Sequence, residues 1–254
     1  MMMTALKQSG RACPEFCFVA TDYTCSPTVG ACTPDLCVIP HEDLTEEFVR
    51  CGIDRDTILP AGIPVRAAFR EKGDRAAARK ALGLPSEGRH IVLMSGSIGC
   101  GPMSDVAEEL DIRMEKGDFA SVLCGSNKQM RYALELRRLR RVEAVGFTTE
   151  VPLYMDSADV LVSKPGGISI TEAGSRGVPL LLADMVGGCE TRNQEFFTAH
   201  GWASACPPED MASAALRFLG DPAAASALVA AQHRAFDGLA ADRITRAVLD
   251  RCGK

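Results

Sequence analysis

Three segments of this sequence could hold a phosphorylated ligand, because each joins a short apolar run to small or polar residues. Residues 96–101 (GSIGCG) follow the apolar run 90–95, residues 164–173 read KPGGISITEA, and residues 187–193 read GGCETRN. Glycines let backbone N–H groups approach phosphate oxygens, and the amino end of a helix favours a bound anion. The first segment is neither a Walker A loop nor a complete GxGxxG motif, so its spacing alone does not identify a nucleotide site.

Each segment also has an ordinary structural explanation. Residues 96–101 suit a tight turn as well as they suit a diphosphate. Glu172 falls in the first turn of a predicted helix, where its carboxylate could accept hydrogen bonds from a ribose diol or interact with the helix dipole. Residues 187–193 suit either a ligand rich in hydroxyl groups or a solvated loop. Taken singly, the segments leave these alternatives open.

The elements that must position these segments alternate along the chain. Short apolar runs are separated by stretches with helical spacing, which predicts βαβ units and hence an α/β fold with helices on both faces of a parallel sheet. Such sheets bind ligands at the carboxyl ends of their strands, where the three segments fall. Strands are predicted at 16–20, 35–40, 90–95, 119–124, 142–147, 160–163 and 179–183, helices at 41–51, 74–82, 105–116, 151–156, 169–176, 211–219, 223–237 and 240–252, a basic helix ending at 141, and a linker at 59–65.

Composition narrows the function classes. The 254 residues carry 28 basic and 33 acidic side chains, a net charge of −5, which argues against a nucleic-acid-binding protein because that needs a basic surface. No apolar run reaches the roughly 18 residues of a membrane helix, and the first residues lack a secretory apolar core, so we expect a cytoplasmic protein. The cysteines form no CxxC pair, so they are expected to fill apolar space rather than bind a metal.

Several longer segments together resemble one family. Between residues 16 and 202 the chain resembles the GT-B glycosyltransferases that include monogalactosyldiacylglycerol synthases and bacterial diacylglycerol glucosyltransferases, with MurG as a more distant relative. The resemblance implies the carboxyl-terminal Rossmann-like lobe of a GT-B fold, preceded by a remnant of the amino-terminal lobe. Its segments are 19–24 (VATDYT), 36–53 (LCVIPHEDLTEEFVRCGI), 61–72 (AGIPVRAAFREK), 96–101, 122–127 (VLCGSN), 145–173 (VGFTTEVPLYMDSADVLVSKPGGISITEA), which is the most specific, and 188–197 (GCETRNQEFF).

The resemblance implies a role for each matching residue. The donor would be UDP-glucose or UDP-galactose, bound with no cofactor and no metal ion. The hexose would pass to diacylglycerol with inversion, while helix dipoles and backbone amides stabilise the departing UDP. Gly96, Ser97 and Gly99 would face the diphosphate, Phe147 would lie near the uracil, Gly166, Gly167 and Ser169 would line the phosphate and ribose, Glu172 would hold the ribose hydroxyls, and Glu190 and Asn193 would contact the sugar ring.

The sequence departs from the family at its amino-terminal end. Two Rossmann-like lobes need roughly 300 residues, whereas the AGIPVR linker here ends at residue 66. We therefore predict that residues 1–63 are a remnant of the acceptor lobe with the linker, and that residues 64–254 form the nucleotide-sugar-binding lobe. A late start of the reading frame, a split enzyme whose partner chain supplies the acceptor lobe, or a decayed relative would each explain the difference.

The catalytic base has no clear match. The glycine- and histidine-rich acceptor loop, where the family's base is expected, has no counterpart, so Asp22 is the remaining candidate, with capping of a turn as its alternative role. Ser26 stands where the family usually has a histidine, and Cys189 where it usually has a glutamine. The catalytic residue therefore stays unassigned, and so does the identity of the hexose.

These observations predict a hexosyltransferase of glycolipid synthesis in which this chain supplies mainly the donor site. The alternatives are MurG-like transfer to another lipid-linked acceptor, and a non-catalytic nucleotide-binding subunit that needs a partner chain. The expected location is the cytoplasm, with peripheral attachment at the inner face of the cell membrane as a further expectation. A basic set could contact lipid headgroups there or form a solvated helix face, namely Arg131, Arg137, Arg138, Arg140 and Arg141.

Overall fold

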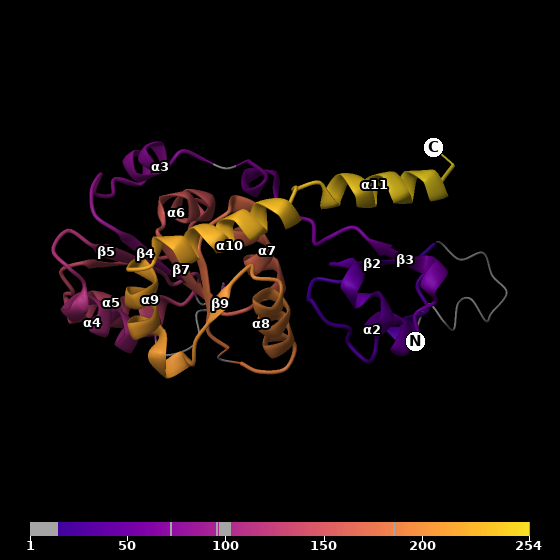
Figure 1. Cartoon of the computed structure of the whole chain (residues 1–254), viewed down its shortest axis with the longest axis horizontal. Coiled ribbons are helices and arrows are strands. Elements are labelled where there is room, and N and C mark those ends of the chain that lie inside the picture. The colour runs from indigo at the N-terminus through magenta and orange to yellow at the C-terminus, as the bar shows by residue number, and fades with distance from the viewer. Residues whose placement is uncertain (1–14, 72, 95, 97–102, 185, 254) are drawn as a thin grey trace. The chain divides into compact units, whose positions relative to one another are not determined.

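The computed structural model describes residues 15–71, 73–94, 96, 103–184 and 186–253. These residues form two compact units, which can be followed by colour along the chain in Figure 1. Unit 1 combines the described residues up to Val65 with those from Gly238 onward, and unit 2 comprises Arg66–Asp237. Each unit is built on its own parallel sheet.

Unit 1 is a three-stranded sheet in the order β1-β2-β3. The central strand β2 is buried along its whole length, and an apolar cluster covers it where Ile244 and Val248 of the last helix pack against Leu36 and Val38. The last helix of the chain therefore belongs to the core of unit 1. The strands are β1 (Cys17–Val19), β2 (Leu36–Ile39) and β3 (Ile58–Pro60), and the helices are α2 (Thr45–Arg50) and α11 (Ala240–Arg251), with short 3-10 turns at Gly30–Cys32, Glu42–Leu44 and Arg55–Thr57.

Unit 2 is a six-stranded parallel sheet in the order β6-β5-β4-β7-β8-β9. Its strands are β4 (His90–Met94), β5 (Phe119–Leu123), β6 (Val142–Val145), β7 (Val160–Ser163), β8 (Leu180–Leu182) and β9 (Ser204–Ala205). Its helices are α3 (Arg75–Leu82), α4 (Met103–Arg113), α5 (Lys128–Arg137), α6 (Val151–Ser157), α7 (Gly167–Arg176), α8 (Cys189–Ala199), α9 (Met211–Leu219) and α10 (Pro222–Ala235), with 3-10 turns at Ala67–Phe69 and Pro208–Asp210.

Alternation along the strands builds a core on both faces of this sheet. Ile91 and Leu93 of β4 point to the face covered by α4, α5 and α9, where they join one apolar cluster. Val92, between them, is equally buried but lies on the opposite face, where α3, α6, α7 and α10 contact one another. A strand buried on both faces reads as a continuous apolar run, which is why β4 and β5 are evident from the sequence.

The structure confirms the predicted fold class, an α/β fold with helices on both faces of a parallel sheet. Each predicted strand is present, but two strands were missed. The predicted linker 59–65 begins within β3, whose terminal Pro60 is tolerated because β3 is an edge strand. The second is β9, which has only two residues and carries no periodic signal.

Two other predictions differ from the structure. No helix was predicted for the segment 187–193, which suits either a ligand rich in hydroxyl groups or a solvated loop, whereas from Cys189 onward it forms the start of α8. The last helix was placed with residues 64–254, whereas α11 packs in unit 1 because its Ile244, Ala247 and Val248 cover the sheet there. The observed division after Val65 lies two residues beyond the predicted one.

Within the described ranges, no single helix has the length and apolar composition needed to cross a membrane. One bent pair of helical segments, Pro208–Leu219 and Pro222–Arg251, meets that requirement only when its two parts are taken together.

Candidate functional site

A cavity of about 210 Å³ lies at the carboxyl ends of the central strands of unit 2. Gly96 enters it just after β4, Gly125 just after β5, and Phe147 just after β6. Parallel α/β sheets bind their ligands at this edge. The complete lining is Arg66, Met94, Gly96, Leu123, Gly125, Gly146, Phe147, Thr148, Thr149, Val151, Ser169 and Glu172.

Helix α7 supplies two polar side chains to this cavity. Gly166 is its N-cap, and the helix begins at Gly167 without a capping side chain. Ile170 and Ala173 are completely buried against the protein, which leaves Ser169 and Glu172, one turn apart, on the side that lines the cavity. The predicted residues Ser169 and Glu172 are therefore neighbours on one helix face.

Glu172 is the carboxylate of the cavity. Its side chain is 12% exposed, and Nε of Arg66 lies 3.6 Å from its Oε1. Burial raises the pKa of the Glu172 carboxyl above its ordinary value, and the charge of Arg66 opposes that rise. A largely buried carboxylate that lines the cavity and has one distant cationic partner can accept hydrogen bonds from a ligand hydroxyl.

An exposed aromatic ring stands at the rim of the cavity. Phe147 is 76% exposed and follows directly on Gly146, where a β-carbon would lie 2.9 Å from Nη1 of Arg131. A large apolar ring kept in water gains contact area when a planar base covers it. The position of Phe147 is thus compatible with the predicted contact to a uracil ring.

A partly buried ion pair adjoins the cavity at Gly96. Lys164 follows β7, and its Nζ donates to Oε1 of Glu190 on α8. Glu190 is 8% exposed, and its Oε2 is buried with no hydrogen-bond partner among the described residues. Asn193, one turn further along α8 and completely buried, donates from Nδ2 to the carbonyl oxygen of Pro165 at 2.9 Å.

One carboxylate holds two residues at the start of α8. Asp184 accepts hydrogen bonds from the hydroxyl of Thr191 at 2.5 Å and from the backbone N–H of Gly187 at 2.8 Å. Burial alone would raise the pKa of Asp184, but these hydrogen bonds hold it below its ordinary value. Asp184 therefore orients the start of α8, where Glu190 lies in the first turn.

The structure places the predicted site residues as follows. Gly96, Phe147, Ser169 and Glu172 line the cavity, Gly166 and Gly167 form the start of α7, and Glu190 and Asn193 lie on α8, joined to the turn at 164–165. Ser97 and Gly99 lie outside the described residues. Asp22 belongs to unit 1, in the bend after β1. Sequence reasoning gave no role to Arg66 or Lys164, although each stands in a segment that carries the resemblance.

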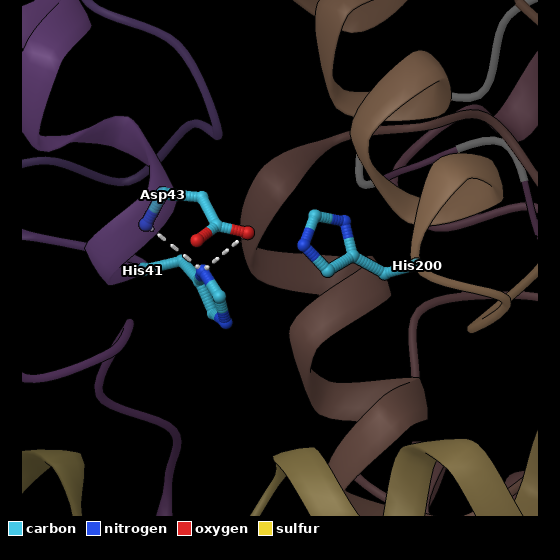
Figure 2. Close-up of side chains that lie close together, drawn as sticks. All are labelled: His41, Asp43 and His200. Atoms are coloured by element: carbon cyan, nitrogen blue, oxygen red, sulfur yellow. Dashed lines mark hydrogen bonds and ion pairs between the residues drawn. The ribbon is translucent and has the colours of Figure 1, made fainter.

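The histidines have local structural roles. In unit 1, Nδ1 of His41 accepts from the backbone N–H of Asp43 at 3.2 Å and lies 3.5 Å from its carboxylate (Figure 2). In unit 2, the ring of His200 stacks on Phe196 with centroids 4.1 Å apart and lies 4.6 Å from Trp202. No histidine is among the described residues that line the cavity.

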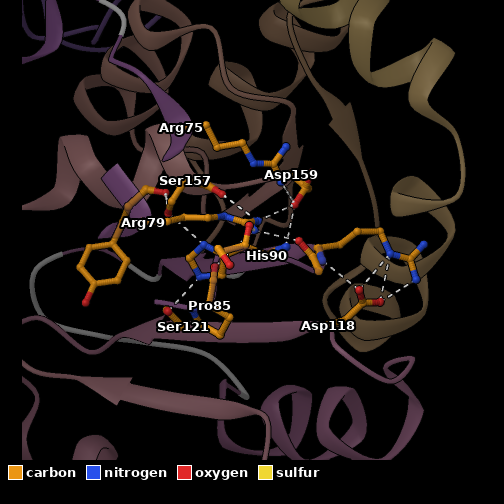
Figure 3. Close-up of polar contacts among 12 residues, drawn as sticks. Arg75, Arg79, Pro85, His90, Asp118, Ser121, Ser157 and Asp159 are labelled. Atoms are coloured by element: carbon orange, nitrogen blue, oxygen red, sulfur yellow. Dashed lines mark hydrogen bonds and ion pairs between the residues drawn. The ribbon is translucent and has the colours of Figure 1, made fainter. Parts of the chain in front are cut away.

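His90 belongs to a polar network at the opposite, amino-terminal edge of the sheet (Figure 3). The Ser157 hydroxyl donates to the carbonyl oxygen of Tyr154, so it accepts from Nδ1 of His90 at 2.9 Å. Nε2 then accepts from the hydroxyl of Ser121, also at 2.9 Å. Burial lowers the pKa of His90 to about 3, with the charge of Arg79 adding to the shift. His90 is therefore a neutral core residue.

A second cavity, of about 500 Å³, opens at this amino-terminal edge of unit 2. Its guanidinium groups are engaged in ion pairs, namely Arg75 with Asp159, Arg89 with Asp118, and Arg176 with Asp156. Because the positive charges already have partners, the larger cavity is a weaker candidate for an anionic ligand than the smaller one at the carboxyl edge.

The basic set near α5 is partly neutralised within the protein. Nε of Arg131 donates to Glu135 at 2.8 Å, and Nη2 of Arg137 donates to Asp105 at 3.0 Å. Nη1 of Arg141 donates to the carbonyl oxygen of Met114 at 3.0 Å. These contacts favour a solvated, internally paired surface for three of the five arginines.

Two family models match the chain. The model described as monogalactosyldiacylglycerol (MGDG) synthase matches residues 1–65, and the model described as glycosyl transferases group 1 matches residues 103–234. Similar proteins include a probable monogalactosyldiacylglycerol synthase of Glycine max, 28% identical over 82% of this chain, and a processive diacylglycerol beta-glucosyltransferase of Staphylococcus carnosus, 30% identical over 63%. The matches cover 41% of the length of each of these two relatives.

Solved structures with the same fold include MurG of Acinetobacter baumannii, with a TM-score of 0.64 at 12% identity over 97% of this chain and 69% of that one. HepE of Anabaena in complex with UDP-glucose has a TM-score of 0.61 at 17% identity, over 98% of this chain and 75% of that one. At these identities the similarity establishes the GT-B fold and nothing finer.

Proposed function

The chain belongs to the glycosyl transferases of group 1, and from that membership we propose that unit 2 binds a UDP-hexose whose sugar is transferred to diacylglycerol. The observation that carries this proposal is the cavity at the carboxyl edge of the sheet, with its recessed Glu172 carboxylate beside glycine-led turns. Relatives named as monogalactosyldiacylglycerol synthases and as a diacylglycerol beta-glucosyltransferase support the acceptor class. UDP-glucose or UDP-galactose is the proposed donor.

In this proposal each side of the cavity recognises a different part of the donor. Phe147 packs against the uracil, and Glu172 accepts hydrogen bonds from the ribose hydroxyls. A cavity of about 210 Å³ is below the roughly 300–1,000 Å³ of sites that enclose a drug-sized ligand. It therefore suits the nucleoside, with the diphosphate and hexose extending past Gly96 toward Glu190.

The start of α7 would stabilise the departing UDP. Gly166 and Gly167 leave the first N–H groups of the helix without side-chain caps, and these groups carry the partial positive charge of the helix end. Preorganised donors of this kind stabilise charge that develops on a leaving group. Ser169 would add a hydroxyl near the phosphate and ribose.

We propose inverting transfer to diacylglycerol, with catalysis dependent on a partner chain or on further sequence that supplies the acceptor lobe, and with Asp22 as the candidate base. The proposed location is the cytoplasmic face of a membrane, reached peripherally. Transfer to another lipid-linked acceptor is distinguished from this by the acceptor assay below.

Titration calorimetry in the presence of EDTA tests the donor half. UDP and one of the two UDP-hexoses should bind saturably to the wild type. Glu143→Gln changes an exposed carboxylate outside the lining of the cavity, so this control variant should bind them as tightly as the wild type does. Once a protein that supplies the acceptor lobe is added, radiolabelled hexose should be incorporated into the lipid of vesicles that contain diacylglycerol and not into polyprenyl phosphate-linked acceptors. A folded chain that binds no UDP at millimolar concentration would contradict the proposal.

A further inference from the structure

We propose that Lys164 is a positioning residue of the donor site, which acts through Glu190 by orienting its carboxylate toward the hydroxyl groups of the hexose. The inference rests on the proposed function and extends it to a residue for which neither the sequence nor the comparisons indicate a role. Three features of unit 2 support it, namely the path of the lysine, the unpaired oxygen of Glu190 and the frame that holds both side chains.

The Lys164 side chain runs along the glycine turn next to the cavity. A β-carbon at position 96 would lie 2.7 Å from Cε of Lys164, and one at position 166 would lie 3.7 Å from its Nζ. Gly96 also has a φ of +79°, a backbone angle that residues with a side chain rarely adopt. Glycine at 96 therefore leaves a channel for the lysine, whose ammonium group lies between the start of α7 and Glu190.

Glu190 has a hydrogen-bond acceptor that the described protein does not use. Oε1 accepts from Lys164, but Oε2 is buried without a partner, and the residue is only 8% exposed. An unpaired buried carboxylate oxygen is costly, so a ligand that donates a hydrogen bond there is favoured. The hydroxyl groups of a hexose are donors, whereas an ionised diphosphate offers only acceptors, so Oε2 selects the sugar rather than the phosphates.

The two side chains are held at fixed positions. Asn193, on the same helix as Glu190, donates from Nδ2 to the carbonyl oxygen of Pro165, the residue that follows Lys164, at 2.9 Å. Asp184 accepts a hydrogen bond from Thr191 in the first turn of α8, next to Glu190. Hydrogen bonds of this kind keep a ligand-binding side chain in one orientation. Their loss lowers ligand affinity although the residues that form them do not contact the ligand.

The test compares how much the hexose adds to nucleotide binding. Affinities for UDP and for the preferred UDP-hexose are measured by titration calorimetry in the wild type and in Lys164→Met, which keeps the length of the side chain and removes its charge. A hydrogen bond to a charged group changes affinity by roughly ten-fold or more. We expect Lys164→Met to lose UDP-hexose affinity by that factor, to keep UDP affinity within about three-fold, and to regain the hexose contribution in Lys164→Arg.

Two controls make the result specific. The exposed Lys128→Met on α5 removes a lysine outside the lining of the cavity and should change neither affinity. Glu190→Gln should reproduce the loss, and the double variant with Lys164→Met should lose little more than either single change, because coupled residues are not additive. Fluorescence of Trp202, the single tryptophan of the chain, reports whether each variant of unit 2 is folded.

The outcomes separate this inference from the proposed function. An equal loss of UDP and UDP-hexose affinity in Lys164→Met would make Lys164 a direct phosphate ligand and overturn the positioning role. The positioning role would also be overturned by an unchanged hexose contribution in folded Lys164→Met, or by additive losses in the double variant. In either case, UDP binding by the wild type would leave the proposed function intact. Absence of all nucleotide binding in the wild type would overturn both.

Discussion

Replacing His90 should change how the stability of unit 2 depends on pH. His90 is completely buried, and both of its ring nitrogens are hydrogen-bonded to serine hydroxyls. Its pKa is lowered from 6.5 to about 3, mainly by burial. The folded protein therefore keeps the imidazole neutral at a pH where the unfolded chain binds a proton.

The sign and size of the effect follow from proton linkage. Because the folded pKa lies below the unfolded one, the contribution of His90 to stability is complete above pH 6.5 and is lost as the pH falls toward 3. At about pH 5 the imidazole is almost fully protonated in the unfolded chain and neutral in the folded protein. This difference lowers the free energy of unfolding by about 2 kcal/mol relative to its value at about pH 7.5. His90→Gln lacks a titrating ring, so it should escape this loss.

Urea unfolding followed by Trp202 fluorescence measures the effect, because the single tryptophan lies in unit 2. Between the two pH values the wild type should lose about 2 kcal/mol more than His90→Gln. Ser157→Ala is the matched control, since it removes a hydrogen-bond partner but keeps the imidazole, and its pH dependence should follow the wild type. Parallel pH dependence in wild type and His90→Gln would refute the assignment of a neutral buried histidine.

Three further predictions concern other residues of unit 2. Asp156→Ala leaves the guanidinium of Arg176 buried without its ion-pair partner, so it should destabilise unit 2 by about 3–5 kcal/mol in urea unfolding, whereas replacing both residues by leucine should cost much less. Gly174→Ala places a β-carbon 2.6 Å from the Phe236 ring, so it should lower the thermal midpoint, although glycine-to-alanine changes within helices ordinarily stabilise. Gly96→Val should lower UDP-hexose affinity measured by calorimetry by roughly ten-fold or more, because its side chain would occupy the path of the Lys164 side chain, while the Trp202 unfolding transition stays cooperative.

The fold was predictable from the sequence where burial is complete. Strands β4 and β5 are buried at every position, so each appears as a continuous apolar run that ends at a glycine turn. The position of α11 was not predictable in this way, because an amphipathic helix does not reveal which sheet it covers. Its contacts with β2, which lies some 200 residues earlier in the chain, decide its place.

The candidate site was predictable in part. Ser169 and Glu172 are three residues apart on a helix, so their common face follows from helical geometry once the strand before them is recognised. Helix α8 was not predicted from the sequence, because its first turns are polar and begin after two glycines. The pairing of Lys164 with Glu190 joins residues 26 positions apart, and only the folded chain shows it.

Recognition of ribose by Glu172 is the most direct test of the proposed donor site. Titration calorimetry would compare UDP with 2′,3′-dideoxy-UDP in the wild type and in Glu172→Gln. The wild type should prefer UDP by roughly ten-fold or more, and this preference should weaken as the pH falls through the raised pKa of Glu172. Glu172→Gln should lose the preference without losing stability, because the amide removes the cost of burying a charge. Equal affinity of the wild type for both nucleotides, or an undiminished preference in Glu172→Gln, would contradict the account.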